Sequence, residues 1–433
     1  LRRILKSSTR LFSNPLASEN DRRLTPLAKS LLQGETGCRM PPFYCLPKMH
    51  KNVSPPPGRP IVSACGSLSY ATSQYVDAFF RKYLPAVHTI CTSSDSVLPL
   101  LDQCQPNDAD VVLCADVTAL YPSIPIEEGL TLISEYCKAR NLVPLNELFF
   151  HQQLLRWVLE NNYFEFLGVT YHQIKGTAMG TPVAVTFAQL FLAAIELPIL
   201  STLEYKLYLR YIDDIFGVMS LQTAVDFVAS FNKRFPSIKL DAVTTTRGGV
   251  FLDMHITLTQ PQQKVVCKLY QKAQNRYQYI PPCSNHPPLV FKHWVLQEAK
   301  RYRLKCSLTS DYMIACVSFN NRLIARGYAK SFLARILPMV PTRATLLEQI
   351  KPPSTSKQPS SGRSREPTAL VLTLPGVQHP LPNWRALLQL PADLLADPQY
   401  TKLYGRGNLK VRILNNLPVS TYLTRSRLIS NQK

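Results

Sequence analysis

The sequence predicts an α+β protein, because residues typical of strands and residues typical of helices occupy separate stretches of the chain. Residues 111–116 form a continuous apolar run that ends at a carboxylate, which is typical of a strand buried on both faces. Residues 207–210 and 215–219 are apolar and aromatic, and they flank Tyr211-Ile212-Asp213-Asp214 as the strands of a hairpin would. From residue 286 to about 337 the pattern is helical and strongly basic. The 433 residues suffice for two or three domains.

The remaining helices are predicted from helical spacing and start signals. Thr181 as N-cap, with Pro182 at the first helical position, predicts an apolar helix that runs to about Glu196. A helix that faces the core is predicted by residues at helical spacing after the hairpin: Phe227, Val228, Phe231 and Phe235. Further helical patterns cover residues 24–32, 67–84, 127–139 and 145–160.

The remaining extended segments follow turn and linker signals. Residues 41–60 are dense in proline and predict an extended segment and loop that carry Lys48, Lys51 and Arg59. Residues 351–368 have the composition of a linker. A strand, a turn at Gly248-Gly249 and a second strand are predicted over residues 239–246 and 250–258, and another strand over 265–269.

The net charge of +21 is unevenly distributed. Residues 61–265 contain 13 Lys and Arg against 19 Asp and Glu, a net charge of −6. Residues 1–60 carry +8, residues 266–345 carry +11 and residues 346–433 carry +8. An acidic centre between basic flanks is expected if cations bind in the middle and a polyanion lies across the flanks.

Cysteine spacing and hydropathy exclude two other classes of protein. The 11 cysteines include no C-x-x-C pair and no Cys/His zinc spacing, so we expect buried thiols rather than a zinc site. The apolar stretch 183–200 is interrupted by polar residues and Pro198, so we expect a buried helix and no membrane partner.

Three carboxylates are expected to converge at one edge of a sheet if the predicted strands pair. Asp116 ends one strand, and Asp213 and Asp214 lie in the neighbouring hairpin. Close carboxylates repel one another unless cations lie between them. Mg²⁺ binds carboxylate oxygens together with substrate phosphates, and two such ions stabilise both oxygens of an in-line phosphoryl transfer.

These residues resemble motifs A, B and C of reverse transcriptases, and the finer details resemble the Penelope-like retroelement branch, a relative of telomerase reverse transcriptase. The resemblance covers roughly residues 41–340 and, more weakly, 369–433. It rests on an ordered set of motifs: 46–51 (LPKMHK), 58–63 (GRPIVS), 116–125 (DVTALYPSIP), 176–182 (GTAMGTP), 209–215 (LRYIDDI), 251–253 (FLD), 284–287 (SNHP) and 326–328 (RGY).

The resemblance implies a right-hand polymerase of fingers, a palm with an antiparallel sheet and a helical thumb. It implies an RNA template, a DNA primer and dNTPs as partners, two Mg²⁺ ions (or Mn²⁺) as cofactors and a nuclear location. The C-terminal GIY-YIG nuclease that family members often carry has no counterpart in this sequence. The implied parts are a basic N-terminal extension (1–40), fingers and palm (41–265), a basic thumb (266–345), a Pro/Ser-rich linker (346–368) and a connector (369–433).

The resemblance also implies roles for individual residues. Asp116, Asp213 and Asp214 match the metal-binding catalytic carboxylates. Tyr121 matches the position whose ring excludes a ribose 2′-hydroxyl, and Lys239 is a candidate proton donor to pyrophosphate. Other dNTP-binding positions are Lys48, Lys51, Arg59, Met179 and Gly180. Primer- and template-binding positions are Tyr211, Phe251, Leu252, Lys300, Arg301 and Arg303, and the last three belong to a helix-turn-helix expected over 286–306.

Two alternatives to a reverse transcriptase remain open at this point. An RNA-dependent RNA polymerase shares the palm carboxylates, although Tyr121 and the Tyr-x-Asp-Asp form argue against it. The second alternative is an inactive retroelement remnant that only binds nucleic acid. Retention of all three carboxylates disfavours that remnant.

Overall fold

The computed structural model describes residues 38–48, 54–259, 264–350, 370–375 and 409–414. The predicted helix at 24–32, Lys51, nearly all of the N-terminal extension, and most of the linker and connector lie outside these residues. The described chain forms two compact units. The first contains residues 38–277, 298–321 and 340–350, and the second contains residues 278–297, 322–339 and the two strands near the C-terminus.

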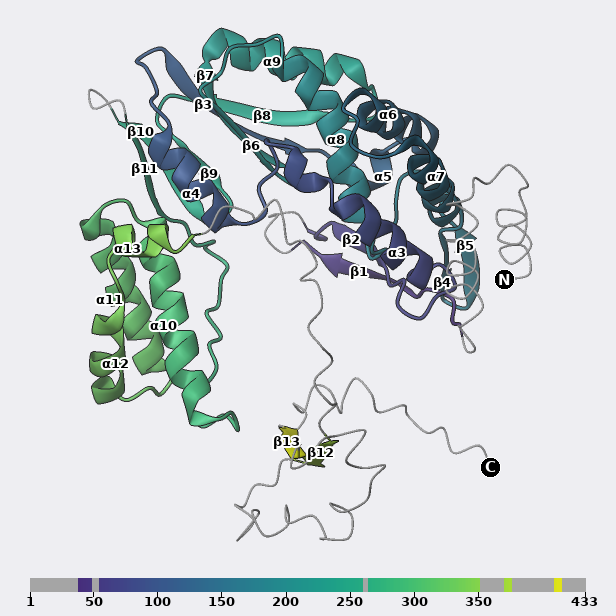
Figure 1. Ribbon diagram of the computed structural model, residues 1–433. Coiled ribbons are helices and arrows are strands. Elements are labelled where there is room, and N and C mark those ends of the chain that lie inside the picture. The colour runs from purple at the N-terminus through teal and green to yellow at the C-terminus, as the bar shows by residue number, and fades with distance from the viewer. Residues whose placement is uncertain (1–37, 49–53, 260–263, 351–369, 376–408, 415–433) are drawn as a thin grey trace, which may run out of the picture. The chain divides into compact units, whose positions relative to one another are not determined.

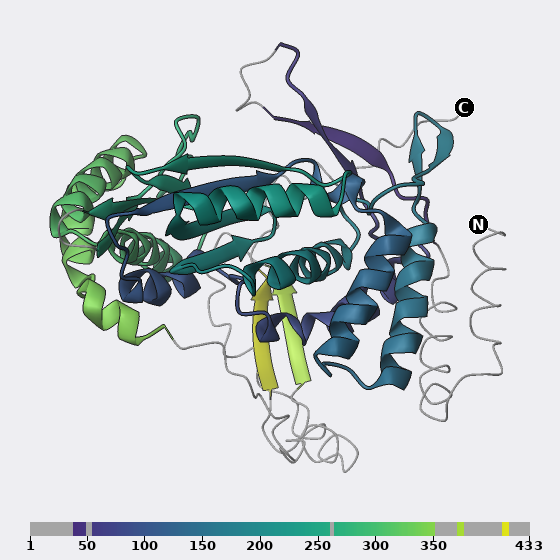
Figure 2. The same cartoon turned by 90° about the horizontal axis from the view of Figure 1, so that it is seen from above.

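The first unit is built on a four-stranded antiparallel sheet (Figures 1 and 2). Its strand order is β6 (Leu207–Tyr211), β7 (Asp214–Ser220), β3 (Asp110–Val117) and β8 (Leu240–Thr245). The predicted hairpin and the predicted central strand are therefore confirmed.

Both faces of this sheet are covered, which explains why β3 is apolar at nearly every position. Val111, Leu113 and Ala115 pack into a core with the helices of the unit, while Val112 faces a second core. Alternate side chains of a strand point to opposite faces, so both sets must be apolar. The helices on the first face include α6 (Ile126–Ala139), α7 (Leu145–Glu160), α8 (Ala184–Leu200) and α9 (Leu221–Arg234).

A three-stranded sheet lies over the second face. It consists of β9 (Gly249–Phe251), β10 (Met254–Thr259) and β11 (Lys264–Leu269). The prediction of a single strand over residues 250–258 is wrong, because a tight turn at Leu252-Asp253 divides it, with Leu252 at a φ of +57°. Phe251 and Met254 are both fully buried. A single strand would point residues three positions apart to opposite faces, so only a turn allows both to reach this core.

The predicted helices over 127–139 and 145–160 are confirmed, and so is the helix in 67–84, observed as α3 (Tyr70–Arg81). The predicted start of α8 is wrong, because the helix begins at Ala184 with Val183 as the N-cap residue. The Oγ of Ser73 in α3 accepts the N–H of Val183 at 3.1 Å. A hydroxyl from another helix therefore does what the Thr181 side chain was expected to do.

Shorter elements complete the first unit. In α9, Phe227 and Phe231 are fully buried as predicted, whereas Phe235 lies just beyond the last helical residue. Two antiparallel hairpins and two short helices are also present: β1 (Phe43–Pro47) with β2 (Gly58–Val62), β4 (Tyr163–Phe166) with β5 (Val169–His172), α4 (Ser94–Gln103) and α5 (Leu120–Ser123).

The helices predicted over residues 286–337 are present as α10 (Pro288–Lys305), α11 (Thr309–Ala325) and α12 (Lys330–Ile336), and α13 (Arg343–Glu348) follows beyond the predicted region. The expected helix-turn-helix over 286–306 is wrong, because α10 is one continuous helix. Beyond Pro288 its sequence has no glycine or proline to interrupt it. None of the helices in the described ranges is long and apolar enough to cross a bilayer.

In the second unit, the indole N–H of Trp294 donates to the Tyr328 hydroxyl at 3.0 Å, and that hydroxyl donates to the carbonyl of Ile280 at 2.7 Å. The strands β12 (Leu370–Pro375) and β13 (Leu409–Leu414) pair in parallel.

The domain boundaries stay predictions. Two elements lie across them, since β11 spans residue 265 and α13 continues past residue 345.

Candidate active site at the end of the central sheet

The pairing of β3 with β7 sets two of the predicted carboxylates directly opposite each other. Asp116 is the register partner of Asp214 at the last paired position of these strands. Asp213 lies in the turn just before β7, and its backbone carbonyl accepts the N–H of Val117 at 3.1 Å. The structure therefore brings Asp116, Asp213 and Asp214 to one end of the sheet, as the sequence predicts.

The charges of these carboxylates affect one another. The pKa of Asp214 is raised to about 6, first by burial and then by the negative charges of Asp116 and Asp213. A hydrogen bond from the backbone N–H of Leu252 and the positive charge of Lys272 partly oppose this rise. A raised carboxyl pKa means that the ionised form is penalised at neutral pH. A bound cation would remove that penalty.

The donor atoms at this end of the sheet fit a hard divalent cation. Carboxylate oxygens are the ligands that Mg²⁺ prefers, and it usually takes one or two of them together with waters and substrate phosphates. Within the described ranges, no group of three or more His, Cys, Asp or Glu side chains is placed so that it could hold a metal ion. Metal binding by Asp116, Asp213 and Asp214 stays a prediction.

Asp241 is a fourth carboxylate at this position, which the sequence analysis missed. It is the register partner of Asp116 on β8, the strand on the other side of β3. Cross-strand partners lie on the same face of a sheet. The signal available in the sequence was an acidic residue in the third position of the strand predicted over 239–246.

A fully buried ion pair between Arg210 and Glu196 stabilises the turn that carries Asp213. The Nε of Arg210 donates to Oε2 of Glu196 at 2.7 Å, and its Nη1 donates to the carbonyl of Ile212 at 3.1 Å. Glu196 also accepts from the hydroxyls of Tyr208 and Thr89, at 3.0 and 2.7 Å. Ile212 has a φ of +59°, so this contact secures a residue in the left-handed region.

Arg210 and Glu196 are functional neighbours to which the sequence analysis gave no role. Each is a lone charged residue in an apolar segment. Two such residues of opposite sign predict a buried pair, because an unpaired buried charge is costly.

The charges of Asp213 and Arg59 act on the Tyr121 hydroxyl in opposite directions. Its pKa is raised to about 12, first by burial and then by the negative charge of Asp213, while the positive charge of Arg59 opposes the rise. Tyr121 belongs to α5, and its backbone carbonyl accepts the N–H of Thr177 at 2.8 Å. The backbone of Tyr121 is thus linked to the loop 176–182.

The loop 176–182 fits tightly between α5 and β2. A Cβ on Gly176 would lie 2.3 Å from the carbonyl oxygen of Tyr121, and a Cβ on Gly180 would lie 2.2 Å from that of Val62. The carbonyl of Met179 accepts the N–H of Val62 at 2.8 Å. Both glycines also have positive φ, so only glycine fits at either position.

Two further predicted dNTP-binding residues, Arg59 and Lys48, lie at the β1–β2 hairpin. Arg59 is exposed on β2. Lys48 follows β1, where its backbone N–H donates to the carbonyl of Pro57 at 2.9 Å. Lys51 lies outside the described residues. Their roles toward a triphosphate remain predictions.

A cavity of about 720 Å³ lies beside the Asp213 turn. Tyr211 and Ile212 line it together with Pro182, Val185 and Gln189 from the region where α8 begins. Tyr211, a predicted primer or template contact, therefore borders open space.

Phe251 and Lys239 have structural roles that the sequence analysis did not give them. The Phe251 ring is fully buried, 5.5 Å from the ring of Phe216, so its side chain cannot contact a primer. The Nζ of Lys239 donates to the carbonyl of Asn232, near the C-terminal end of α9, at 2.8 Å. A cation is favoured there by the helix dipole.

The three predicted nucleic-acid contacts on α10 have different surroundings. Lys300 is half-buried. Arg303 lies over the ring of Tyr312 at 5.0 Å. The guanidinium of Arg301 is bound to Asp253 and Glu298, so its charge is neutralised within the protein.

Comparison with known proteins shows similarity at the level of fold. No family model matches the sequence, and no curated protein sequence matches it. A solved telomerase from Candida albicans, in complex with a fragment of telomeric RNA, has a TM-score of 0.50 at 10% identity, over 69% of this chain and 55% of that one. The chain thus spans about half the length of that protein.

Two further solved structures are more distant. A telomerase from Candida tropicalis has a TM-score of 0.43 at 12% identity, over 76% of this chain and 59% of that one. An insertion-loop deletion mutant of the RNA-dependent RNA polymerase of a human picobirnavirus has a TM-score of 0.43 at 13% identity, over 69% of this chain and 59% of that one.

Proposed function

We propose that this chain is an RNA-directed DNA polymerase of the Penelope-like type, which extends a primer 3′-hydroxyl with dNTPs on an RNA template. One observation carries the proposal: β3 and β7 pair so that Asp116 faces Asp214, next to Asp213. The ordered sequence motifs and the fold similarity to a telomerase support it.

The chain's own residues supply the following chemistry in this proposal. Asp116, Asp213 and Asp214 bind Mg²⁺, which, when bound, stabilises the attacking and leaving oxygens of the transferred phosphoryl group. Arg59 offsets charge on the incoming triphosphate. Tyr121 packs where a ribose 2′-hydroxyl would lie and so selects deoxynucleotides.

Primer extension tests this proposal. Purified protein is incubated with Mg²⁺, a primed RNA template, and either dNTPs or NTPs, beside an Asp213→Ala/Asp214→Ala variant. An Asp226→Ala variant is the matched control, because Asp226 is an exposed carboxylate of α9 that accepts a hydrogen bond from Gln222 of the same helix. We expect dNTP extension by the wild type and the control, and a loss of at least about 10³-fold in the double variant.

Other outcomes assign the chain differently. Extension with NTPs rather than dNTPs would identify an RNA-dependent RNA polymerase. Template binding without extension by the wild type would identify an inactive nucleic-acid-binding remnant. A Tyr121→Ala variant that incorporates no more ribonucleotide than the wild type would remove the proposed role of Tyr121.

A further inference from the structure

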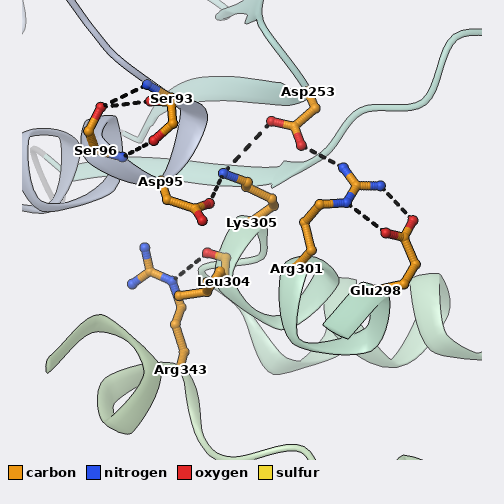
Figure 3. Close-up of polar contacts among 9 residues, drawn as sticks. All are labelled: Ser93, Asp95, Ser96, Asp253, Glu298, Arg301, Leu304, Lys305 and Arg343. Atoms are coloured by element: carbon orange, nitrogen blue, oxygen red, sulfur yellow. Dashed lines mark hydrogen bonds and ion pairs between the residues drawn. The ribbon is translucent and has the colours of Figure 1, made fainter. Parts of the chain in front are cut away.

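A cluster of charged residues surrounds the turn between β9 and β10 (Figure 3). The Nη1 of Arg301 in α10 donates to Oδ2 of Asp253 in the turn at 2.6 Å. The same guanidinium binds both carboxylate oxygens of Glu298, at 3.0 and 2.7 Å. One turn of helix later, the Nζ of Lys305 donates to Oδ1 of Asp95 in α4 at 2.6 Å and lies 3.8 Å from Oδ1 of Asp253.

The charged side chains of this cluster are partly or fully buried, and this restricts the partners that each can have. The Lys305 side chain is 0% exposed, whereas that of Asp253 is 27% exposed. A buried ammonium without a partner is strongly disfavoured, so Lys305 is paired with Asp95 and has Asp253 as a second carboxylate within 4 Å. Asp253 is therefore attracted by two cations of the same helix, α10.

The strand that leads into this turn packs on the central sheet beside the candidate active site. The ring of Phe251 in β9 lies 5.5 Å from the ring of Phe216, which is two residues after Asp214 in β7. The Cys114 thiol of β3 lies 3.8 Å from the carbonyl of Val250 in β9. A displacement of this turn would therefore disturb the packing against the strand that carries Asp214.

We propose that Asp253 is a positioning residue for the reaction, held by Arg301 and Lys305 so that β9 stays packed on β7 and β3 next to the Asp214 carboxylate. This inference rests on the proposed polymerase function, since Asp214 is the catalytic group that it positions. It assigns Arg301 and Lys305 of α10 to the support of the catalytic carboxylate. The resemblance suggested only nucleic-acid contact for Arg301.

The test compares Asp253→Asn with Asp102→Asn in the full chain. Asp102 is a matched control, because it binds Arg343 through two contacts of 2.9 Å in the same unit, and its side chain is 33% exposed. Both residues are thus partly exposed aspartates that bind an arginine, but Asp102 belongs to α4 and Asp253 to the β9–β10 turn. Hydrogen–deuterium exchange is measured over residues 249–256, and kcat and KM are measured with active-site titration.

For Asp253→Asn we expect faster exchange in residues 249–256 and a kcat lowered about tenfold. We expect the KM for dNTP and the Kd for primed template to stay within about twofold of the wild type. For Asp102→Asn we expect a kcat within about twofold and unchanged exchange in that segment. A purely structural role for Asp253 would reduce the titrated fraction of active protein and leave kcat unchanged.

The outcomes separate this inference from the proposed function. If the wild type extends primers and the two variants have equal kcat, the positioning role is wrong. If the wild type extends no primer, the proposed function fails. The exchange measurement then decides alone, and equal exchange in both variants would show that Asp253 does not hold the turn.

Discussion

At the scale of single residues, the ionisation of Asp214 links the site to folding stability. Its pKa is raised to about 6 in the folded chain from the ordinary value of 3.8. The folded state therefore binds more protons than the unfolded state between these values. Below about pH 4 the Asp214 carboxyl does not lower the free energy of unfolding. As the pH rises to about 6, ionisation of Asp214 lowers the free energy of unfolding progressively.

Asp214→Asn is therefore expected to stabilise the metal-free protein at pH 7.5 but not at pH 4. A rise of the pKa from 3.8 to about 6 corresponds to about 3 kcal/mol, and solvent screening of a half-buried group reduces this to about 1–2 kcal/mol. Chemical unfolding with EDTA at both pH values measures the difference. Excess Mg²⁺ should stabilise the wild type more than the variant, and equal stabilisation would argue against metal binding by Asp214.

At the scale of elements, Gly176 in the loop 176–182 can be compared with Gly168, a glycine of similar backbone conformation. Gly176 and Gly168 both have positive φ, +69° and +77°. A Cβ on Gly176 would meet the Tyr121 carbonyl at 2.3 Å, whereas a Cβ on Gly168 would meet nothing within 4 Å. Alanine is thus strained at both positions but clashes at only one.

Gly176→Ala is expected to lower the free energy of unfolding by about 1–3 kcal/mol more than Gly168→Ala, because overpacking adds to the common backbone strain. It should also reduce nucleotide incorporation, since the clash displaces the segment that carries Tyr121. Urea unfolding and primer extension measure both effects. Equal losses in the two variants would show that the loop moves freely away from α5.

Several elements could be predicted from the sequence because their signals are local. The apolar run of β3, the flanks of the Asp213 turn and the basic helical pattern after residue 286 each lie within one segment. The convergence of Asp116 with Asp213 and Asp214 then required only that neighbouring strands pair.

What could not be predicted depends on contacts between distant segments. The start of α8 is set by Ser73, about a hundred residues earlier in the chain. The position of Asp241 depends on the register of β8 against β3. The division of 250–258 depends on the burial of both Phe251 and Met254 in a core shared with the central sheet, and the local pattern does not show that burial.

At the scale of the whole molecule, the charge distribution predicts how nucleic-acid binding depends on salt. Residues 266–345 carry 13 Lys and Arg against 2 Asp and Glu, whereas residues 61–265 carry a net charge of −6. Each phosphate that a cation neutralises releases bound counterions and steepens the fall of affinity with salt.

A Lys330→Gln/Arg335→Gln variant is expected to reduce the slope of log affinity against log salt by about one to two. Both residues are exposed on α12. The matched control is Lys233→Gln/Arg234→Gln, which removes two exposed cations from α9 in the acidic region. Filter binding to a primed RNA template across a salt series measures the slopes. A larger change in the control would place the polyanion elsewhere.

The position of β3 in the centre of its sheet also fixes the order in which a growing chain can complete the site. Asp116 faces Asp214 on one neighbour and Asp241 on the other, and both neighbours are synthesised much later. At ~5–20 residues per second, β3 waits on the order of 5–20 s for its first partner. During that time its apolar edges are unpaired and open to association with other chains. A nascent chain that ends before residue 214 contains a strand that is apolar on both faces but has no sheet to join. This topology therefore predicts a risk of aggregation during synthesis.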